Sequence, residues 1–142
     1  MNQQPEEKKK LLILIPAFEA SQHITSVIDR IPESLSDDFI VEILIIDDAS
    51  KDDTPSAAAD HLQNQSPIPE WTIYTNPINQ GYGGNQKLGY RYAIDNSFDV
   101  VVMVHGDGQY PPEEIGPLAF LALQHGAAFG SRMSKKSQAI KL

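Results

Sequence analysis

The sequence predicts an α/β fold, a Rossmann-like parallel sheet with helices on both of its faces. Two observations predict it. Short apolar runs alternate with segments of helical periodicity along most of the 142-residue chain. The apolar runs also lack the polar–apolar alternation of a sheet that has one face in water, so each predicted strand is expected to be covered on both sides. Such strands, separated by helices, form parallel sheets with right-handed crossovers.

Caps and breakers fix several ends of the predicted elements. In chain order the elements are a disordered lead (1–10), a strand (11–15), a helix (22–31), a strand (41–46), a helix capped at 53 or 54, a strand (71–75), a helix (81–96), a strand (100–104), a helix (111–125) and a short strand (127–130). Ser21 is a candidate N-cap, and Pro32 ends the first helix. Pro55 stands near the first position of the second helix, and Gly126 stops the last one.

The acidity of the chain limits what it can bind. The formal net charge is −8, from 11 Lys and Arg against 19 Asp and Glu, which predicts no nucleic-acid partner because phosphate backbones need a basic face. A single nucleotide remains compatible, since a metal ion or a helix N-terminus can neutralise one diphosphate. The absence of cysteine excludes disulfides and thiolate metal sites and favours a cytoplasmic location. No segment approaches the ~20 apolar residues that span a bilayer.

Polar residues gather where the predicted strands end. Residues 16–19, 47–48, 105–109 and 131–132 follow the first, second, fourth and fifth strands. The carboxyl ends of parallel strands share one edge of a sheet, and ligands of such sheets bind beyond that edge. The four clusters are therefore expected to converge on one binding site.

The segment after the fourth strand has donors for a divalent cation. His105, Asp107 and Gln109 share a face if the strand continues, and a carboxylate with an amide oxygen suits Mg²⁺ or Mn²⁺ when substrate phosphates complete the shell. An isolated Asp-Gly-Gln is more often a capping turn before a helix. The remaining histidines fall in helical stretches and are expected to be ordinary surface or packing residues: His23, His61 and His125.

Two further clusters each leave two interpretations open. Asp47 and Asp48 could bind a metal or accept hydrogen bonds from a base or ribose, but Asp-rich turns also cap helices. The Gly-rich segment 79–85, which includes Gly81, could cradle phosphate at a helix N-terminus or could simply be a turn. It lacks the G-x-G-x-x-G spacing, so it gives little support to dinucleotide binding.

Taken together, these segments resemble glycosyltransferase family 2, the group of GT-A fold enzymes that includes dolichyl-phosphate mannose synthase-like proteins. The matching segments, in the family's order, are residues 15–18, 45–54, 81–89, 102–113 and 130–132. The resemblance implies that residues 11–142 are the N-terminal part of such a domain, truncated on its C-terminal side. A fragment of this kind is expected to bind a donor but to be nearly inactive alone.

The resemblance also implies roles for individual residues. Pro16 and Phe18 would wall the nucleobase pocket, and Asp48 would accept a hydrogen bond from the base. Asp107 matches the last Asp of the family's D-x-D metal motif, and Arg132 matches a basic residue near phosphate.

Two departures from the family pattern accompany these matches. Gln109 matches a further metal-proximal residue of the family. The first departure is His105, which stands in place of the first Asp of D-x-D. An imidazole there could ligate Mn²⁺ or only contact the ribose. Glu19-Ala20 stands where the family often has Asn-Glu.

The implied reaction is inverting transfer of a sugar from a UDP- or GDP-type donor, with Mg²⁺ or Mn²⁺ stabilising the leaving diphosphate. The acceptor could be a glycan or a polyprenyl phosphate at a membrane surface. A hydroxyl acceptor needs a general base, which would lie beyond Leu142.

Three other protein classes share part of this pattern. A response-regulator receiver carries its acidic pair after strand one, whereas here the pair follows strand two. A sugar nucleotidyltransferase has its Gly-rich loop after strand one, where this chain has residues 16–19. A non-catalytic nucleotide-binding module remains a third interpretation.

Overall fold

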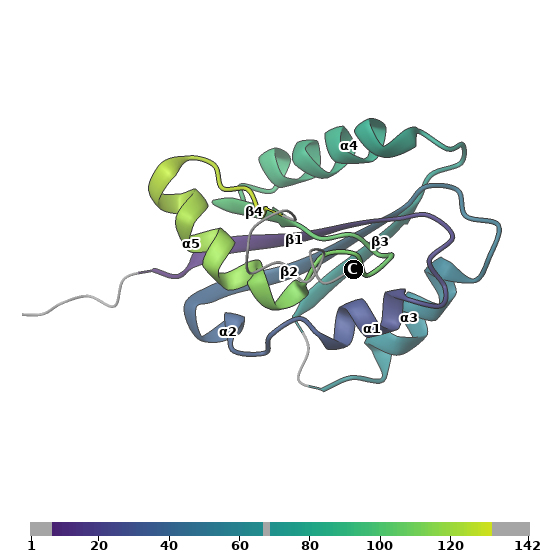
Figure 1. Ribbon diagram of the computed structural model, residues 1–142, viewed down its shortest axis with the longest axis horizontal. Helices are drawn as coiled ribbons and strands as arrows, with labels where there is room; N and C mark the ends of the chain where they lie inside the picture. Colours follow the sequence, from purple (N-terminus) through teal and green to yellow (C-terminus); the bar gives the residue numbers. More distant parts are fainter. Residues whose placement is uncertain (1–6, 67–68, 132–142) are drawn as a thin grey trace, which may run out of the picture.

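The computed structural model describes residues 7–66 and 69–131, in which four strands form one parallel sheet in the order β3-β2-β1-β4 (Figure 1). The strands are β1 (Lys9–Ala17), β2 (Phe39–Asp47), β3 (Glu70–Thr75) and β4 (Val100–Met103). The helices are α1 (Ile24–Asp29), α2 (Leu35–Asp38), α3 (Thr54–Gln63), α4 (Gly81–Asp95) and α5 (Ile115–His125), with a 3₁₀ turn η1 (Pro112–Glu114) before α5.

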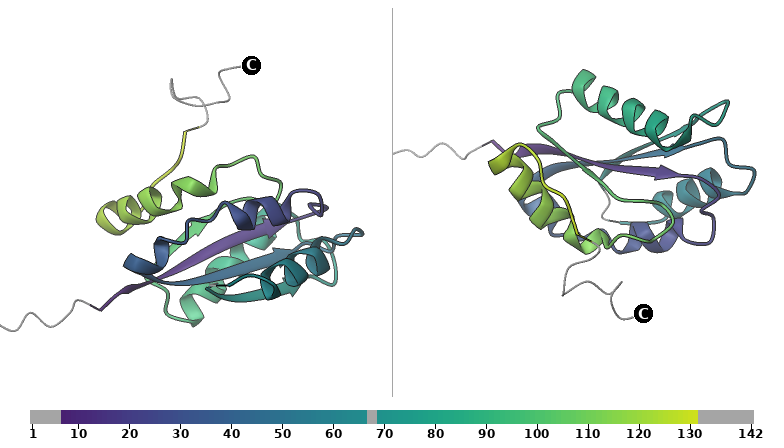
Figure 2. Two further views of the ribbon diagram at one scale, coloured as in Figure 1. Left: turned by 90° about the horizontal axis from the view of Figure 1, so that it is seen from below. Right: turned by 45° about the horizontal axis from the view of Figure 1, so that its top comes forward.

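The helices are divided unequally between the two faces of the sheet. Within the described ranges, α4 is the one helix on one face, whereas α1, α2, α3 and α5 lie on the other (Figures 1 and 2). The predicted α/β class, a parallel sheet with helices on both faces, is confirmed. Among residues 7–66 and 69–131, no helix is both long enough and apolar enough to cross a membrane.

The inner strands β1 and β2 bury side chains on both of their faces, which explains their unbroken apolar runs, whereas the edge strand β3 is only partly covered. In β1, Leu11, Ile13 and Ile15 point into the larger core under α1, α2, α3 and α5. Leu12 and Leu14 point the other way, into a smaller core with α4. All five side chains are fully buried. The sheet is therefore the middle layer of the structure, with helices on either side.

Helix α4 approaches the sheet closely through small residues. Its buried positions are Asn85, Gly89 and Ala93, which recur every four residues and so form one stripe. A Cβ atom added at Gly89 would lie only 2.4 Å from Cδ2 of Leu14. The closeness of α4 to β1 therefore depends on a residue without a side chain.

Several element ends agree with the caps read from the sequence. Helix α3 begins at Thr54 with a proline in its first turn, and α5 ends before Gly126, which has φ = +85°. Other ends differ. Helix α1 begins at Ile24 rather than after Ser21, and the short α2 was not expected. β1 begins at Lys9, inside the segment predicted to be a disordered lead.

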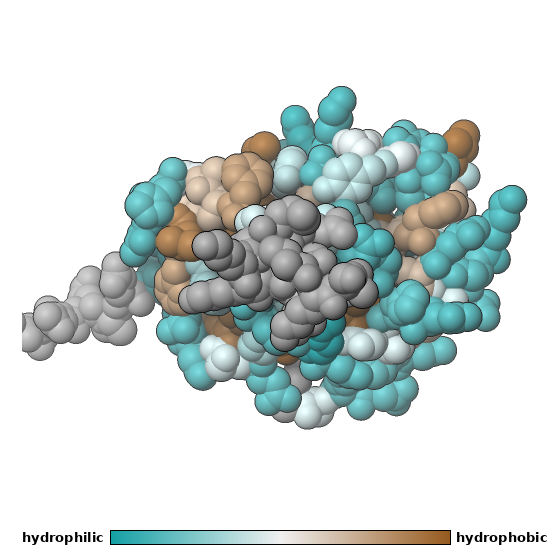
Figure 3. Space-filling view, in the orientation of Figure 1, coloured by the Kyte–Doolittle hydropathy of each residue, from teal (hydrophilic) through white to brown (hydrophobic). Residues whose placement is uncertain are grey.

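The predicted fifth strand is wrong. Residues 127–130 have no strand structure, and the Phe129 side chain is 93% exposed. An apolar run this short forms a strand only where a neighbouring edge pairs with it and both faces are covered. Instead, hydrophobic residues remain at the surface over α5, whose exposed side chains include Phe120 and Leu121 (Figure 3).

The packing of α4 on β1 gives the first prediction. We expect Gly89→Ala to lower the free energy of unfolding by about 1–3 kcal/mol, because its Cβ would overlap the fully buried Leu14 side chain. Gly83→Ala is the matched control. Nothing lies within 4 Å of its Cβ position, and alanine should stabilise the helix by up to about 1 kcal/mol. Urea denaturation measures both, and equal midpoints for the two variants would contradict this account.

Candidate functional site

The carboxyl ends of the four strands bring three of the predicted polar clusters to one edge of the sheet. In the strand register, Ala17 of β1 stands beside Asp47 of β2, which stands beside Thr75 of β3. Backbone hydrogen bonds continue the pairing into the loops, since Asp48 N donates to Ala17 O at 2.9 Å and Gly106 N donates to Pro16 O at 3.1 Å. Arg132, of the fourth cluster, lies outside the described residues.

The loop after β1 presents one large apolar ring to solvent. Pro16 is buried within β1, whereas the Phe18 side chain just beyond the strand is 52% exposed. The next residue, Glu19, has a positive φ of 47°, and its N–H donates to Ser50 Oγ at 2.8 Å. The loop is thus tied to the one that follows β2, and Phe18 is held at the edge of the sheet.

The Asp48 carboxylate links the end of β2 to the start of α4. It is buried and accepts three hydrogen bonds, from Asn76 Nδ2 (2.9 Å) and Gln80 N (2.6 Å) on Oδ1 and from Gly81 N (2.9 Å) on Oδ2. Its own carbonyl accepts from Asn79 Nδ2 at 3.0 Å. A negative charge at this place also suits the positive end of the helix dipole.

Two asparagines extend this network: Asn76, which sequence analysis did not identify, and Asn85, the last residue of the Gly-rich segment that could cradle phosphate. Asn76 Nδ2 also donates to Asn85 Oδ1 at 2.6 Å, and Asn85 Nδ2 donates to the carbonyl of Ile46 at 3.3 Å. Both side chains are buried. The one available signal was the position of Asn85, an amide in line with Gly89 and Ala93 on the buried stripe of α4.

Asp47 differs from its neighbour because its carboxylate is only partly satisfied. The side chain is fully buried, and Oδ2 accepts from Ser50 N at 3.1 Å. Oδ1 has no hydrogen-bond partner in the described part of the chain. Asp47 therefore lies beneath the site, whereas the loops on either side of it reach solvent.

The loop after β4 carries the remaining predicted side chains. Asp107 and Gln109 are exposed, and Gln109 N donates to Asp107 Oδ1 at 3.1 Å. His105 is half-buried beside the rings of Tyr82 and Tyr110, with centroid distances of 5.2 and 4.7 Å. Burial lowers the pKa of the His105 imidazole, and the charge of Asp107 opposes that shift.

The side chains of this loop do not make up a closed metal site. Among the described residues, no three His, Cys, Asp or Glu side chains gather as a metal cluster. One carboxylate, one imidazole and one amide on a single loop fit an ion whose remaining ligands are phosphate oxygens and water. Mg²⁺ and Mn²⁺ ions are commonly held this way beside nucleotides.

A second carboxylate fastens the loops after β1 and β2 together. Asp52 accepts hydrogen bonds from the backbone and hydroxyl of Thr54 and from Ser21 N. The Thr54 hydroxyl in turn accepts from Ala20 N at 2.8 Å. The hydrogen bond from the Thr54 hydroxyl, followed by those from Ser21, lowers the pKa of the Asp52 carboxyl from 3.8 to about 2.

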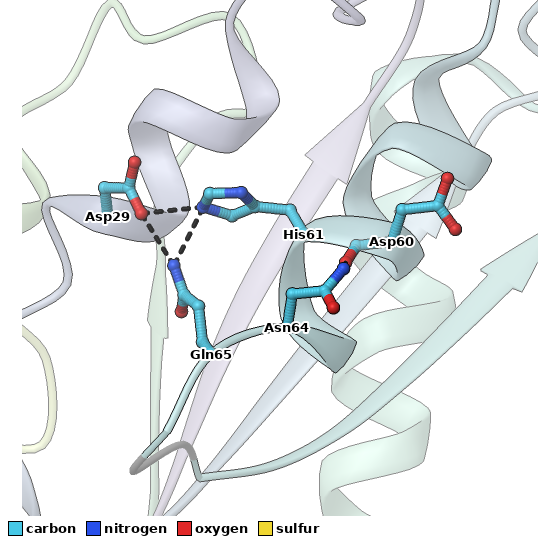
Figure 4. Close-up of polar contacts among 5 residues, drawn as sticks. All are labelled: Asp29, Asp60, His61, Asn64 and Gln65. Atoms are coloured by element: carbon cyan, nitrogen blue, oxygen red, sulfur yellow. Dashed lines mark hydrogen bonds and ion pairs between the residues drawn. The ribbon is translucent and has the colours of Figure 1, made fainter.

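One polar cluster lies away from the carboxyl edge, between α1 and α3 (Figure 4). His61 Nε2 and Gln65 Nε2 each lie 2.6 Å from Asp29 Oδ1, beside a hollow of about 860 Å³ near the amino ends of β2 and β3. His61, expected to be an ordinary residue, thus links two helices. The cluster is too far along the sheet to belong to the site.

The Asp48 network predicts a loss of stability. We expect Asp48→Ala to lower the free energy of unfolding by about 1–3 kcal/mol, because three N–H donors lose their acceptor. Asp53→Ala is the control, since that exposed side chain makes no capping hydrogen bond and its loss should change stability by less than about 0.5 kcal/mol. Chemical denaturation that shows equal effects for both variants would refute the proposed linkage.

The lowered pKa of Asp52 predicts how its contribution depends on pH. A carboxyl whose pKa is lower in the folded chain stabilises it above the unfolded value, and this contribution disappears as pH falls through the folded value. Wild type should therefore be more stable than Asp52→Asn at pH 7, and the difference should shrink between about pH 4 and pH 2. Urea midpoints at stepped pH measure this. A constant difference across that range would show that the charge of Asp52 is unimportant.

Comparisons with known proteins agree on one family. The model of "Glycosyl transferase family 2" matches residues 12–139. Undecaprenyl-phosphate mannosyltransferase of Micrococcus luteus is 24% identical over 87% of this chain and 48% of that protein. Polyprenol monophosphomannose synthase of Mycolicibacterium smegmatis is 28% identical over 87% of this chain and 45% of that protein. The chain thus spans about half the length of these curated relatives.

Solved structures share the fold. Mannosyltransferase PcManGT from Pyrobaculum calidifontis, in complex with GDP-Man and Mn²⁺, superposes with a TM-score of 0.63 at 21% identity, covering 78% of this chain and 31% of that one. TarS 1–349 of S. aureus in complex with UDP superposes with a TM-score of 0.62 at 16% identity, covering 89% of this chain and 40% of that one.

Proposed function

The chain belongs to glycosyltransferase family 2, and we propose that it is the donor-binding half of a metal-dependent, inverting enzyme that transfers a sugar from a nucleoside diphosphate. One observation carries the proposal. Phe18, Asp48 and Asp107 follow three adjacent strands and meet at the carboxyl edge of the sheet. Parallel α/β sheets bind their ligands at that edge.

The base would bind between the loops after β1 and β2. Phe18 offers an exposed ring for stacking, and Pro16, buried within β1, would form part of the wall of the same pocket. Asp48 would accept a hydrogen bond from the base. A carboxylate has about four acceptor positions, and three donors already use three of them, so Oδ2 keeps one position. Asp47 would support this loop from below.

The diphosphate would lie between the loop after β4 and the start of α4. Asp107 would hold Mg²⁺ or Mn²⁺ together with Gln109 and His105, and the ion would stabilise negative charge on the leaving diphosphate. Nothing lies within 4 Å of the Cβ position of Gly81, which supports a close approach of phosphate there. Arg132 would add a positive charge.

The acceptor would attack the anomeric carbon on the side opposite the leaving diphosphate. We propose a polyprenyl phosphate at a membrane surface, since two relatives are named for undecaprenyl phosphate and polyprenol. A phosphate acceptor is already anionic and needs no general base to activate it. In this proposal Asp48 binds the nucleobase and Asp107 binds the metal, so neither carboxylate is needed as a general base.

Calorimetric titration with GDP and UDP, with and without Mn²⁺, tests this function. We expect one nucleotide to bind more tightly with Mn²⁺, and we expect Asp107→Asn to weaken that binding at least about tenfold without changing the fold. Asp60→Asn, an exposed carboxylate on α3, is the control and should bind normally. A wild-type chain that binds neither nucleotide would overturn the proposal. Unchanged binding by Asp107→Asn would remove that residue from the metal site.

A further inference from the structure

Aromatic rings hold His105 in a fixed place at the donor edge. The ring of Tyr82, in the first turn of α4, lies 5.2 Å from the imidazole centroid, and that of Tyr110, in the loop before η1, lies 4.7 Å from it. Tyr82 is itself held, because its hydroxyl accepts a hydrogen bond from Gln86 Nε2 at 3.1 Å. The imidazole is therefore positioned by a ring of α4 as well as by its own loop.

The backbone around His105 is fixed as well. Val104 N donates to Leu14 O at 3.0 Å, and Gly106 N donates to Pro16 O at 3.1 Å, so β1 anchors the residues on both sides of His105. A Cβ at Gly106 would lie 3.0 Å from Ala17 Cβ, which leaves little space for movement there. His105 and Asp107 are consequently presented from the same anchored turn.

The imidazole nitrogens of His105 are available for a ligand. The imidazole packs beside Tyr82 and Tyr110 and feels the charge of Asp107, and across residues 7–66 and 69–131 neither nitrogen has a hydrogen-bond partner. By contrast, the carboxylate of Asp48 is occupied by three donors, and that of Asp47 is buried. Asp107 is thus the one exposed carboxylate among these four side chains.

We propose that His105 is a nitrogen ligand of the divalent ion and makes this site prefer Mn²⁺ to Mg²⁺, with Tyr82 as its positioning residue. The inference rests on the function proposed above. Mg²⁺ strongly prefers oxygen ligands in octahedral geometry, whereas imidazole nitrogen suits transition-metal ions. A neutral imidazole in place of a carboxylate also removes one negative charge, which is the main attraction that Mg²⁺ would find there.

Pulsed EPR of Mn²⁺ bound to the 142-residue chain with GDP or UDP tests the nitrogen ligand directly. We expect electron spin-echo modulation from a coordinated imidazole ¹⁴N in wild type. The modulation should disappear in His105→Asp and persist in His125→Asn, a matched change at an exposed histidine on α5. Because the readout is a bond between nitrogen and manganese, it is independent of sugar transfer.

Competition by Mg²⁺ for bound Mn²⁺ tests the selectivity. His105→Asp should lower the ratio of Mn²⁺ to Mg²⁺ affinity at least about tenfold. Tyr82→Ala should lower this ratio too, and Tyr82→Phe, which keeps the ring, should restore most of it. Tyr82 is 53% exposed, so neither change should disturb the core.

The outcomes separate this inference from the proposed function. Nucleotide and Mn²⁺ binding without ¹⁴N modulation, or an unchanged ion preference in His105→Asp, would overturn the role of His105 and leave the donor site intact. Absence of both nucleotide and Mn²⁺ binding would overturn the two proposals together.

Discussion

The arrangement of the carboxyl edge depends on the hydrogen bonds that the Asp48 carboxylate accepts. They connect β2 to the first residues of α4 and to the loop after β3. Helix α4 is the single helix on its face of the sheet in the described residues, and its close packing on Leu14 leaves it few alternative positions. Because Tyr82 stands in the first turn of α4, the same carboxylate indirectly sets where the ring beside His105 lies. The buried Asp48 carboxylate thus helps to position a helix, a loop and an aromatic contact.

The paired aspartates show how two adjacent residues of one type acquire different tasks. Asp47 ends β2 inside the sheet, where side chains alternate between covered faces. Asp48 is one residue further and so points toward the opposite side, where Asn76 and the start of α4 supply donors. A third carboxylate, Asp52, joins the neighbouring loops in the same way. The edge is therefore a set of loops cross-linked by short acidic side chains.

The sequence predicted the sheet, the faces and the region of the site, because apolar runs, helical spacing and the residues after each strand are local signals. It did not predict which acid would be engaged by protein donors, since Asn76 lies 28 residues from Asp48 in the sequence and is itself bonded to Asn85, a further 9 residues along the chain. Nor did it predict that His105 would pack beside Tyr82, because Tyr82 comes from another element. The wrong strand at 127–130 has a similar cause, since a strand requires a partner edge that composition does not reveal.

The strand order has a consequence for how the chain folds during synthesis. β1 is the central strand, yet one of its two neighbours, β4, follows only after the other elements of the sheet, and the contact of Lys10 with Asp99 spans 89 residues. Pairings of such long sequence separation form slowly. During synthesis one edge of β1 therefore stays open until β4 has been made, while β2 and β3 can already pair. Lys8, Lys9 and Lys10 at its start place positive charges beside that edge, and such charges discourage a second nascent chain from adding to it.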